Sequence, residues 1–86
     1  MTITLYTMPN YPHCVRAKTA LDAHGVTYST VIIHDKSKRH AFYDGIADDM
    51  SVYPENVRRT LPKLQAGDTW VPSADDIVAM CLNGML

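Results

Sequence analysis

The first 33 residues read as a strand, a proline-containing loop, a helix and a second strand in direct succession, and this order constrains the fold more than any other feature. Residues Thr2–Thr7 alternate, with Ile3 and Leu5 on one face and the threonines on the other, which is typical of a half-buried strand. Residues Val26–Ile33 are rich in β-branched side chains and predict the second strand.

The segment between these strands predicts a loop followed by a helix. Two prolines, Pro9 and Pro12, restrict φ in the loop, and Pro12 suits the first position of a helix. Residues 12–24 favour that helix, and Gly25 is a typical terminator. A strand, a helix and a strand at this spacing predict a parallel pair of strands and therefore an α/β fold.

The second half of the chain predicts further helices and a hairpin. Ala41, Phe42, Ile46 and Met50 recur at helical intervals, behind a cap at Asp35 or Ser37 and with Gly45 weakening the middle. Residues Ser51–Arg59 are interpreted as a loop or one helical turn opened by Pro54. Leu61–Ala66 and Thr69–Val71 flank Gly67-Asp68 and predict an antiparallel hairpin, and Ser73 and Asp76 are spaced as a capping box before a last helix that closes at Gly84.

These elements together predict one small domain over residues 1–86. Their order is β-α-β-α-β-β-α, in a mixed four-stranded sheet flanked by helices, and 86 residues are enough for one compact core. With a net charge of −1, the chain has no global field to hold a polyanion, so nucleic acid is not an expected partner. The basic run Lys36–His40 is interpreted as a solvated helix start.

Cysteine content and hydropathy predict the cellular location of the protein and the state of its thiols. No apolar run is long enough to span a bilayer and no secretory signal is evident, so a cytoplasmic protein without membrane attachment is expected. The protein is also expected to be a monomer. Cys14 and Cys81 are too few for a disulfide framework. Cys81 lies at an apolar-face spacing and is interpreted as a buried, inert thiol that does not pair with Cys14. Trp70 is interpreted as a packing residue of the hairpin, and the histidines His24, His34 and His40 as surface residues.

The loop Asn10-Tyr11-Pro12-His13-Cys14, between a strand and a helix, carries the most chemical information, and here the sequence resembles the glutaredoxin family with its thioredoxin-like fold. The resemblance runs from Leu5 through the first helix to Tyr28. It resumes at Arg59-Thr60-Leu61-Pro62 and continues through Gly67-Asp68 and Asp75-Asp76 to Gly84, whereas residues 29–58 match loosely.

The resemblance implies an active site with an unusual change. In the family this loop reads Cys-Pro-x-Cys, and its first cysteine is the exposed nucleophile, but Tyr11 stands at that position. Cys14 matches the second cysteine and is the only active-site thiol. A phenol is not a thiol and is no nucleophile at neutral pH, so a cycle that needs two thiols cannot run here. His13 is interpreted as an exposed residue of the helix start, with assistance to Cys14 as the alternative.

The resemblance also implies a groove for glutathione or a thiol peptide. Pro62 matches the family's cis-proline, Leu61 offers backbone groups to an extended peptide, and Asp75 matches the residue that binds the γ-glutamyl end. Arg59, or Arg58 beside it, is expected to meet a carboxylate at the other end. Met8 replaces a lysine common in the family and Pro72-Ser73 replaces a Gly-Gly pair, so a reduced affinity is expected. The expected binding residues are Tyr11, Arg59, Thr60, Leu61, Pro62, Ala74 and Asp75.

Two functions follow from this sequence. The first is a glutaredoxin-like thiol-disulfide redox protein that binds glutathione or a thiol/disulfide protein, with Cys14 as the thiol that exchanges. The second is a binding module without catalysis, in which Tyr11 fills the thiol position. No metal is expected, because His13 and Cys14 lack further ligands at a usual spacing and because family members that bridge iron-sulfur clusters use the first cysteine.

Overall fold

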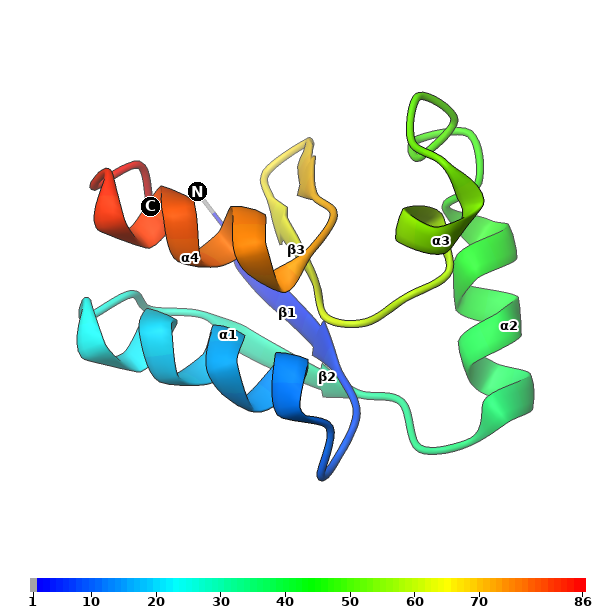
Figure 1. Ribbon diagram of the computed structural model, residues 1–86, viewed down its shortest axis with the longest axis horizontal. Helices are drawn as coiled ribbons and strands as arrows, with labels where there is room; N and C mark the ends of the chain where they lie inside the picture. The colour runs from blue at the N-terminus through cyan, green and yellow to red at the C-terminus, as the bar shows by residue number, and fades with distance from the viewer. Residues whose placement is uncertain (1) are drawn as a thin grey trace.

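The computed structural model describes residues 2–86 and contains one four-stranded sheet with helices on both sides (Figure 1). No helix in this part of the chain has the length and apolar character needed to cross a membrane. The elements are β1 (Ile3–Thr7), α1 (Pro12–Ala23), β2 (Ser29–Ile32), α2 (Lys36–Gly45), α3 (Glu55–Arg58), β3 (Lys63–Ala66), β4 (Thr69–Val71) and α4 (Ala74–Leu82).

The sheet has the strand order β2-β1-β3-β4 and is mixed, as predicted. β1 pairs in parallel with β2, with Thr4 opposite Ser29, and pairs antiparallel with β3, with Leu5 opposite Leu64. β3 and β4 form the expected hairpin around Gly67, whose φ of 59° lies in the left-handed region that glycine adopts easily. This is the thioredoxin-like fold expected from the sequence.

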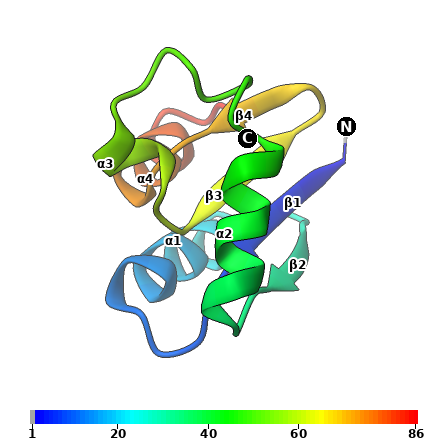
Figure 2. The same cartoon turned by 90° about the vertical axis from the view of Figure 1, so that its right-hand side faces the viewer.

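The two faces of the sheet pack against different helices. α1 and α4 cover one face, where Leu5 and Leu64 are fully buried with Ala17, Leu21 and Ile77. α2 lies in front of the other face (Figure 2), where Phe42 stacks on Tyr6 with ring centroids 4.7 Å apart and Trp70 packs beside them. The prediction that the threonines of β1 share the solvent face is wrong for Thr7, which is buried on the face of Leu5.

Three element boundaries differ from the prediction by two residues or more. The second strand begins at Ser29 rather than Val26, because β2 pairs only with Thr4–Thr7 of β1, whereas the amide of Val26 donates to the carbonyl oxygen of Leu21 at the end of α1. α2 ends at Gly45 instead of continuing to Met50, whose buried side chain belongs to the turns that follow. The third strand begins at Lys63, after the loop that contains Leu61 and Pro62.

Two local signals of the sequence are confirmed. Pro54 precedes the short helix α3, and its carbonyl accepts hydrogen bonds from the backbone amides of Val57 and Arg58. Ser73 is the N-cap of α4, and its side chain accepts a hydrogen bond from the amide of Asp76. This cap fixes the direction in which the chain enters α4. The start of α4 borders the candidate site.

Candidate functional site

A cavity of about 190 Å³ lies where the start of α1, the segment between α3 and β3, and the start of α4 meet. The peptide bond between Leu61 and Pro62 is cis, as the resemblance implied. The structure brings six of the eight predicted site residues to this cavity: Tyr11, Thr60, Leu61, Pro62, Ala74 and Asp75. Residues from three distant segments thus surround one small space, with Arg59 and Cys14 placed outside it.

Tyr11 and Cys14 sit at different depths at the start of α1. Tyr11 is the N-cap of the helix, with Pro12 in the first helical position, and it is half-buried at the cavity wall. Cys14 is only 2% exposed and packs with Ile33, Tyr43 and Leu61. Tyr11 therefore lines this cavity, whereas Cys14 borders a different one, beside Met8 and Pro9.

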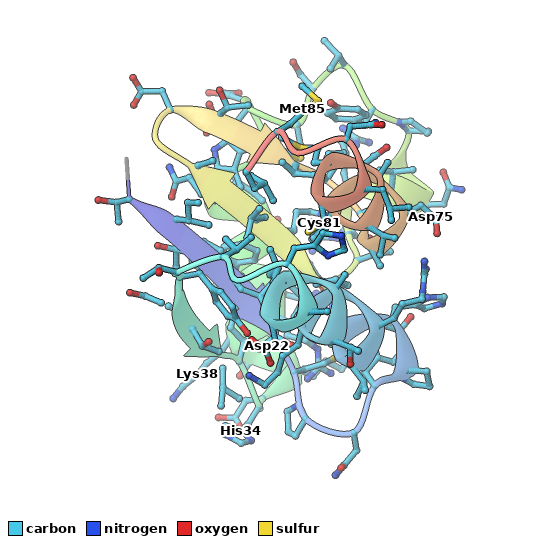
Figure 3. The ribbon with its side chains drawn as sticks, turned by 90° about the vertical axis from the view of Figure 1, so that its left-hand side faces the viewer. Asp22, His34, Lys38, Asp75, Cys81 and Met85 are labelled. Atoms are coloured by element: carbon cyan, nitrogen blue, oxygen red, sulfur yellow. The ribbon has the colours of Figure 1, made fainter. Side chains whose placement is uncertain are left out.

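The rim of the cavity carries an ion pair that sequence reasoning missed. Nη1 of Arg16 lies 2.8 Å from Oδ1 of Asp75 and joins α1 to the start of α4. Nη2 of Arg16 also lies 3.3 Å from Nδ1 of His13. His13, Arg16 and Asp75 all border the cavity. Asp75 is 85% exposed and lies at the outer edge of α4, whereas Cys81 lies on the inner side (Figure 3). An exposed pair of this kind contributes little stability, so Asp75 can exchange partners readily.

Arg59 borders a second cavity of about 260 Å³, which shares Tyr11, Thr60 and Leu61 with the first. Its Nη1 lies 2.9 Å from Oδ1 of Asp44, and its guanidinium lies 5.3 Å from the centre of the Tyr43 ring. Arg58, the alternative candidate, borders neither of these cavities. Arg59 is therefore the better placed of the two arginines for a ligand that lies across Tyr11 and Leu61.

Lys63, which no sequence signal singled out, is completely buried beside the site. Its Nζ donates to the carbonyl oxygens of Val57 at 2.9 Å and Pro72 at 2.8 Å, and lies 3.5 Å from Oγ1 of Thr60. The ammonium therefore ties α3 to the segment before α4, and two of its neighbours, Val57 and Thr60, line the first cavity. Burial lowers the pKa of Lys63 to about 8, because a desolvated ammonium is disfavoured.

Comparison with known proteins places this chain in a family. The sequence pattern of the family described as Glutaredoxin matches residues 3–71, which is most of the chain. The chain belongs to the glutaredoxin family. No curated protein sequence matches it. This membership supports a thiol redox protein in general terms, because thiol-disulfide exchange is the chemistry of glutaredoxins.

Solved structures agree with the glutaredoxin fold at low sequence identity. The chain is similar to glutaredoxin 1 from Francisella tularensis, complexed with cacodylate, with a TM-score of 0.80 and 22% identity over 98% of this chain and 95% of that one. It is also similar to oxidized glutaredoxin 2 from Chlamydomonas reinhardtii, with a TM-score of 0.76 and 24% identity over 99% of this chain and 75% of that one. A glutathione S-transferase from the Antarctic clam Laternula elliptica matches with a TM-score of 0.73 and 20% identity, over 98% of this chain and 35% of that one.

Cys81, the other cysteine of the chain, is remote from the site. Cys81 is 3% exposed inside the core formed by α1 and α4, and burial raises the pKa of its thiol. Both cysteines are free, and they belong to separate buried clusters. Within residues 2–86, no three side chains of His, Cys, Asp or Glu gather as metal ligands would.

Proposed function

We propose that this glutaredoxin binds glutathione or a thiol peptide in the groove formed by the two cavities, with Cys14 as the thiol that exchanges. The observation that carries the proposal is the convergence of Tyr11, Leu61 and Asp75 on one cavity, although they come from separate segments of the chain. Tyr11 takes the place of the family's first cysteine in this proposal. Because the groove is retained while that thiol is missing, Cys14 is the thiol nearest to a bound ligand.

The walls of the groove offer suitable groups to a glutathione molecule. The backbone of Leu61 can pair with an extended peptide as an added strand would. At one end, the carboxylate of Asp75 and the first amides of α4 suit the ammonium and carboxylate of a γ-glutamyl group. At the other end, the guanidinium of Arg59 suits a carboxylate.

The proposed redox reaction consists of two thiol-disulfide exchanges at Cys14. The Cys14 thiolate attacks one sulfur of oxidised glutathione, the Cys14–glutathione bond forms, and one glutathione thiolate leaves. The thiolate of a partner protein then attacks the glutathione sulfur of this mixed disulfide, takes the glutathionyl group and releases the Cys14 thiolate. Cys14 is 2% exposed and borders neither cavity of the groove, so the packing of Tyr11 and Leu61 around it must loosen before the attack.

The direct test is the intact mass of the protein after incubation with oxidised glutathione. We expect an adduct of one glutathione at Cys14 in the wild type, and faster formation in Tyr11→Ala, where the thiol is less covered. Cys14→Ser is the matched control and should form none. A wild type that stays unmodified while the Cys14 of Tyr11→Ala reacts would contradict exchange in the natural protein.

Such a result would leave the second function, a binding module without catalysis, which the 2% exposure of Cys14 favours. In that case Tyr11 is a contact surface for the ligand. Calorimetry should then show glutathione binding by the wild type, weakened about fivefold to tenfold in Tyr11→Ala because an aromatic contact is lost. Unchanged binding in Tyr11→Ala would remove the main support for this function.

The γ-glutamyl end of the proposed site has its own test. Asp75→Asn should raise the Kd for reduced glutathione about fivefold to tenfold, because a charged partner of the ligand ammonium becomes neutral. Asp76→Asn is the matched control, since Asp76 follows Asp75 in α4 but does not border the cavity. Equal affinities of these two variants in calorimetry would exclude a role for the Asp75 carboxylate.

A further inference from the structure

Cys14 borders a third cavity, of about 390 Å³, which we call the β2 cavity. It lies between the loop that follows β1, the first two turns of α1 and the edge strand β2. Tyr11 and Leu61 line both cavities of the groove but not this one. Its volume falls within the range of roughly 300–1,000 Å³ that is typical of small-molecule sites.

The walls of the β2 cavity are mainly apolar. Met8 and Pro9 come from the loop, Val15 from α1 and Ile32 from β2. Val15 is 55% exposed and Ile32 is 53% exposed, and β2 has no further strand on its outer side (Figure 2). An apolar molecule that enters here therefore covers apolar surface that water now contacts, and this burial favours binding.

The polar groups of the β2 cavity favour an uncharged ligand. Among the described residues that line it, Lys18 is the only charged one, and its Nζ lies 3.5 Å from Oδ2 of Asp22. Thr7 also lines the cavity and is only 9% exposed, and its hydroxyl makes no hydrogen bond within residues 2–86. A buried hydroxyl without a partner is available to a ligand, and it can donate a hydrogen bond to a sulfur atom.

We propose that uncharged, apolar disulfides reach Cys14 through the β2 cavity. The proposal deepens the function proposed above and rests on its choice of Cys14 as the exchanging thiol. Cys14 borders the β2 cavity and neither cavity of the groove. A ligand in the β2 cavity therefore meets Cys14 without displacement of Tyr11 or Leu61, whereas a ligand in the groove does not.

The reaction in the β2 cavity is one thiol-disulfide exchange. The Cys14 thiolate attacks the nearer sulfur of the disulfide, a bond forms between this sulfur and Sγ, and the disulfide bond of the ligand breaks. The other half of the ligand leaves as a thiolate and takes a proton from water. Cys14 is oxidised while the leaving half is reduced, so the disulfide itself is the oxidant.

The test compares two small disulfides of equal chain length. Dipropyl disulfide is uncharged, whereas dithiodipropionate carries a carboxylate at each end, and intact mass follows the addition of one half of either molecule to the protein. Each rate is divided by that of the same disulfide with N-acetylcysteine amide. The wild type should then react about tenfold faster with dipropyl disulfide, because a carboxylate loses hydration in an apolar cavity. Cys14→Ser should gain neither group, and equal normalised rates in the wild type would overturn the proposal.

Substitution at the wall of the β2 cavity has a matched control on the same strand. Ile32→Asp places a charge in the cavity and should slow the reaction with dipropyl disulfide about tenfold. Val31→Asp adds the same charge next to it, but Val31 lies opposite Tyr6 on the other face of the sheet and does not border the cavity. Its rate should therefore stay within about twofold of the wild type.

Val15→Asp changes the same cavity from α1 and should slow the reaction as much as Ile32→Asp does. Agreement between these two variants excludes an effect of a disturbed edge strand, because Val15 lies outside β2. A loss in Val31→Asp equal to that in Ile32→Asp would overturn the proposal, because the effect would then be a general one of added charge.

Incubation of the same proteins with oxidised glutathione separates this proposal from the one above. A propyl adduct at Cys14 without a glutathionyl adduct would support the β2 cavity and overturn exchange with glutathione. If both adducts form, Ile32→Asp should slow the propyl reaction and leave the glutathionyl reaction unchanged, because glutathione approaches from the groove. A propyl reaction that Ile32→Asp and Val15→Asp both leave unchanged would overturn the β2 cavity alone.

Discussion

The Tyr11→Cys variant is expected to reduce disulfides with glutathione at least about 100-fold faster than the wild type, because it places an accessible thiol at the start of a helix. Tyr11 is half-buried at the cavity wall, whereas Cys14 is 2% exposed and does not border this cavity. Since the rate of exchange depends on access to the thiolate, the difference in exposure predicts a large difference in rate. The measurement is glutathione-dependent reduction of a small mixed disulfide, with both proteins at equal concentration.

Two further variants identify the source of this activity. Tyr11→Ser opens the same space without adding a thiol, and it should stay far below Tyr11→Cys. Tyr11→Cys/Cys14→Ser should retain most of the gain, because one accessible thiol is enough for exchange with glutathione. Wild-type activity equal to that of Tyr11→Cys would mean that the packing around Cys14 opens freely, contrary to its burial among Ile33, Tyr43 and Leu61.

The path of the backbone around the site was largely predictable from the sequence. Alternation in residues 2–7 and the prolines of the following loop indicated where β1 ends and α1 begins, and Ser73 and Asp76 indicated the start of α4. Each of these signals depends only on residues that are close together in the sequence. The second strand was predicted too long because the β-branched residues before Ser29 favour strands, whereas pairing depends on how far β1 extends.

Contacts between distant segments were not predictable in this way. Arg16 and Asp75 meet only because α1 and α4 pack side by side on one face of the sheet. Lys36 and Arg39 border a cavity only because α2 crosses the other face beside the segment of Arg59. A charged run in a sequence carries no information about what packs against it, so the solvated interpretation was the reasonable prediction for Lys36–His40.

The burial of Lys63 could not be predicted from the sequence pattern. Lys63 also carries the largest expected effect on stability. A lysine at the start of a strand is normally exposed, but β3 is an inner strand whose two faces are both covered. The ammonium finds three oxygen partners among Val57, Thr60 and Pro72, and none of them is charged. Its folded-state pKa of about 8 lies below the value of 10.5 typical of an unfolded lysine. At neutral pH this difference opposes folding by about 3 kcal/mol.

The free energy of unfolding should therefore depend on pH through Lys63. Between pH 8 and pH 10.5 the unfolded chain binds more protons at this lysine than the folded chain, so stability due to Lys63 rises with pH. Burial raises the pKa values of Tyr43 and Cys81, and these groups oppose the trend because they deprotonate first in the unfolded chain. Comparison with Lys63→Met cancels their contribution, since both proteins contain them.

Urea unfolding of the wild type and of Lys63→Met at several pH values measures this contribution. The stability of the wild type relative to Lys63→Met should rise by about 2 to 3 kcal/mol from pH 7 to pH 10. Lys38→Met is the matched control for the loss of a lysine side chain, because Lys38 is 75% exposed. A stability difference between the wild type and Lys63→Met that does not change with pH would mean that water reaches the Lys63 ammonium in the folded protein.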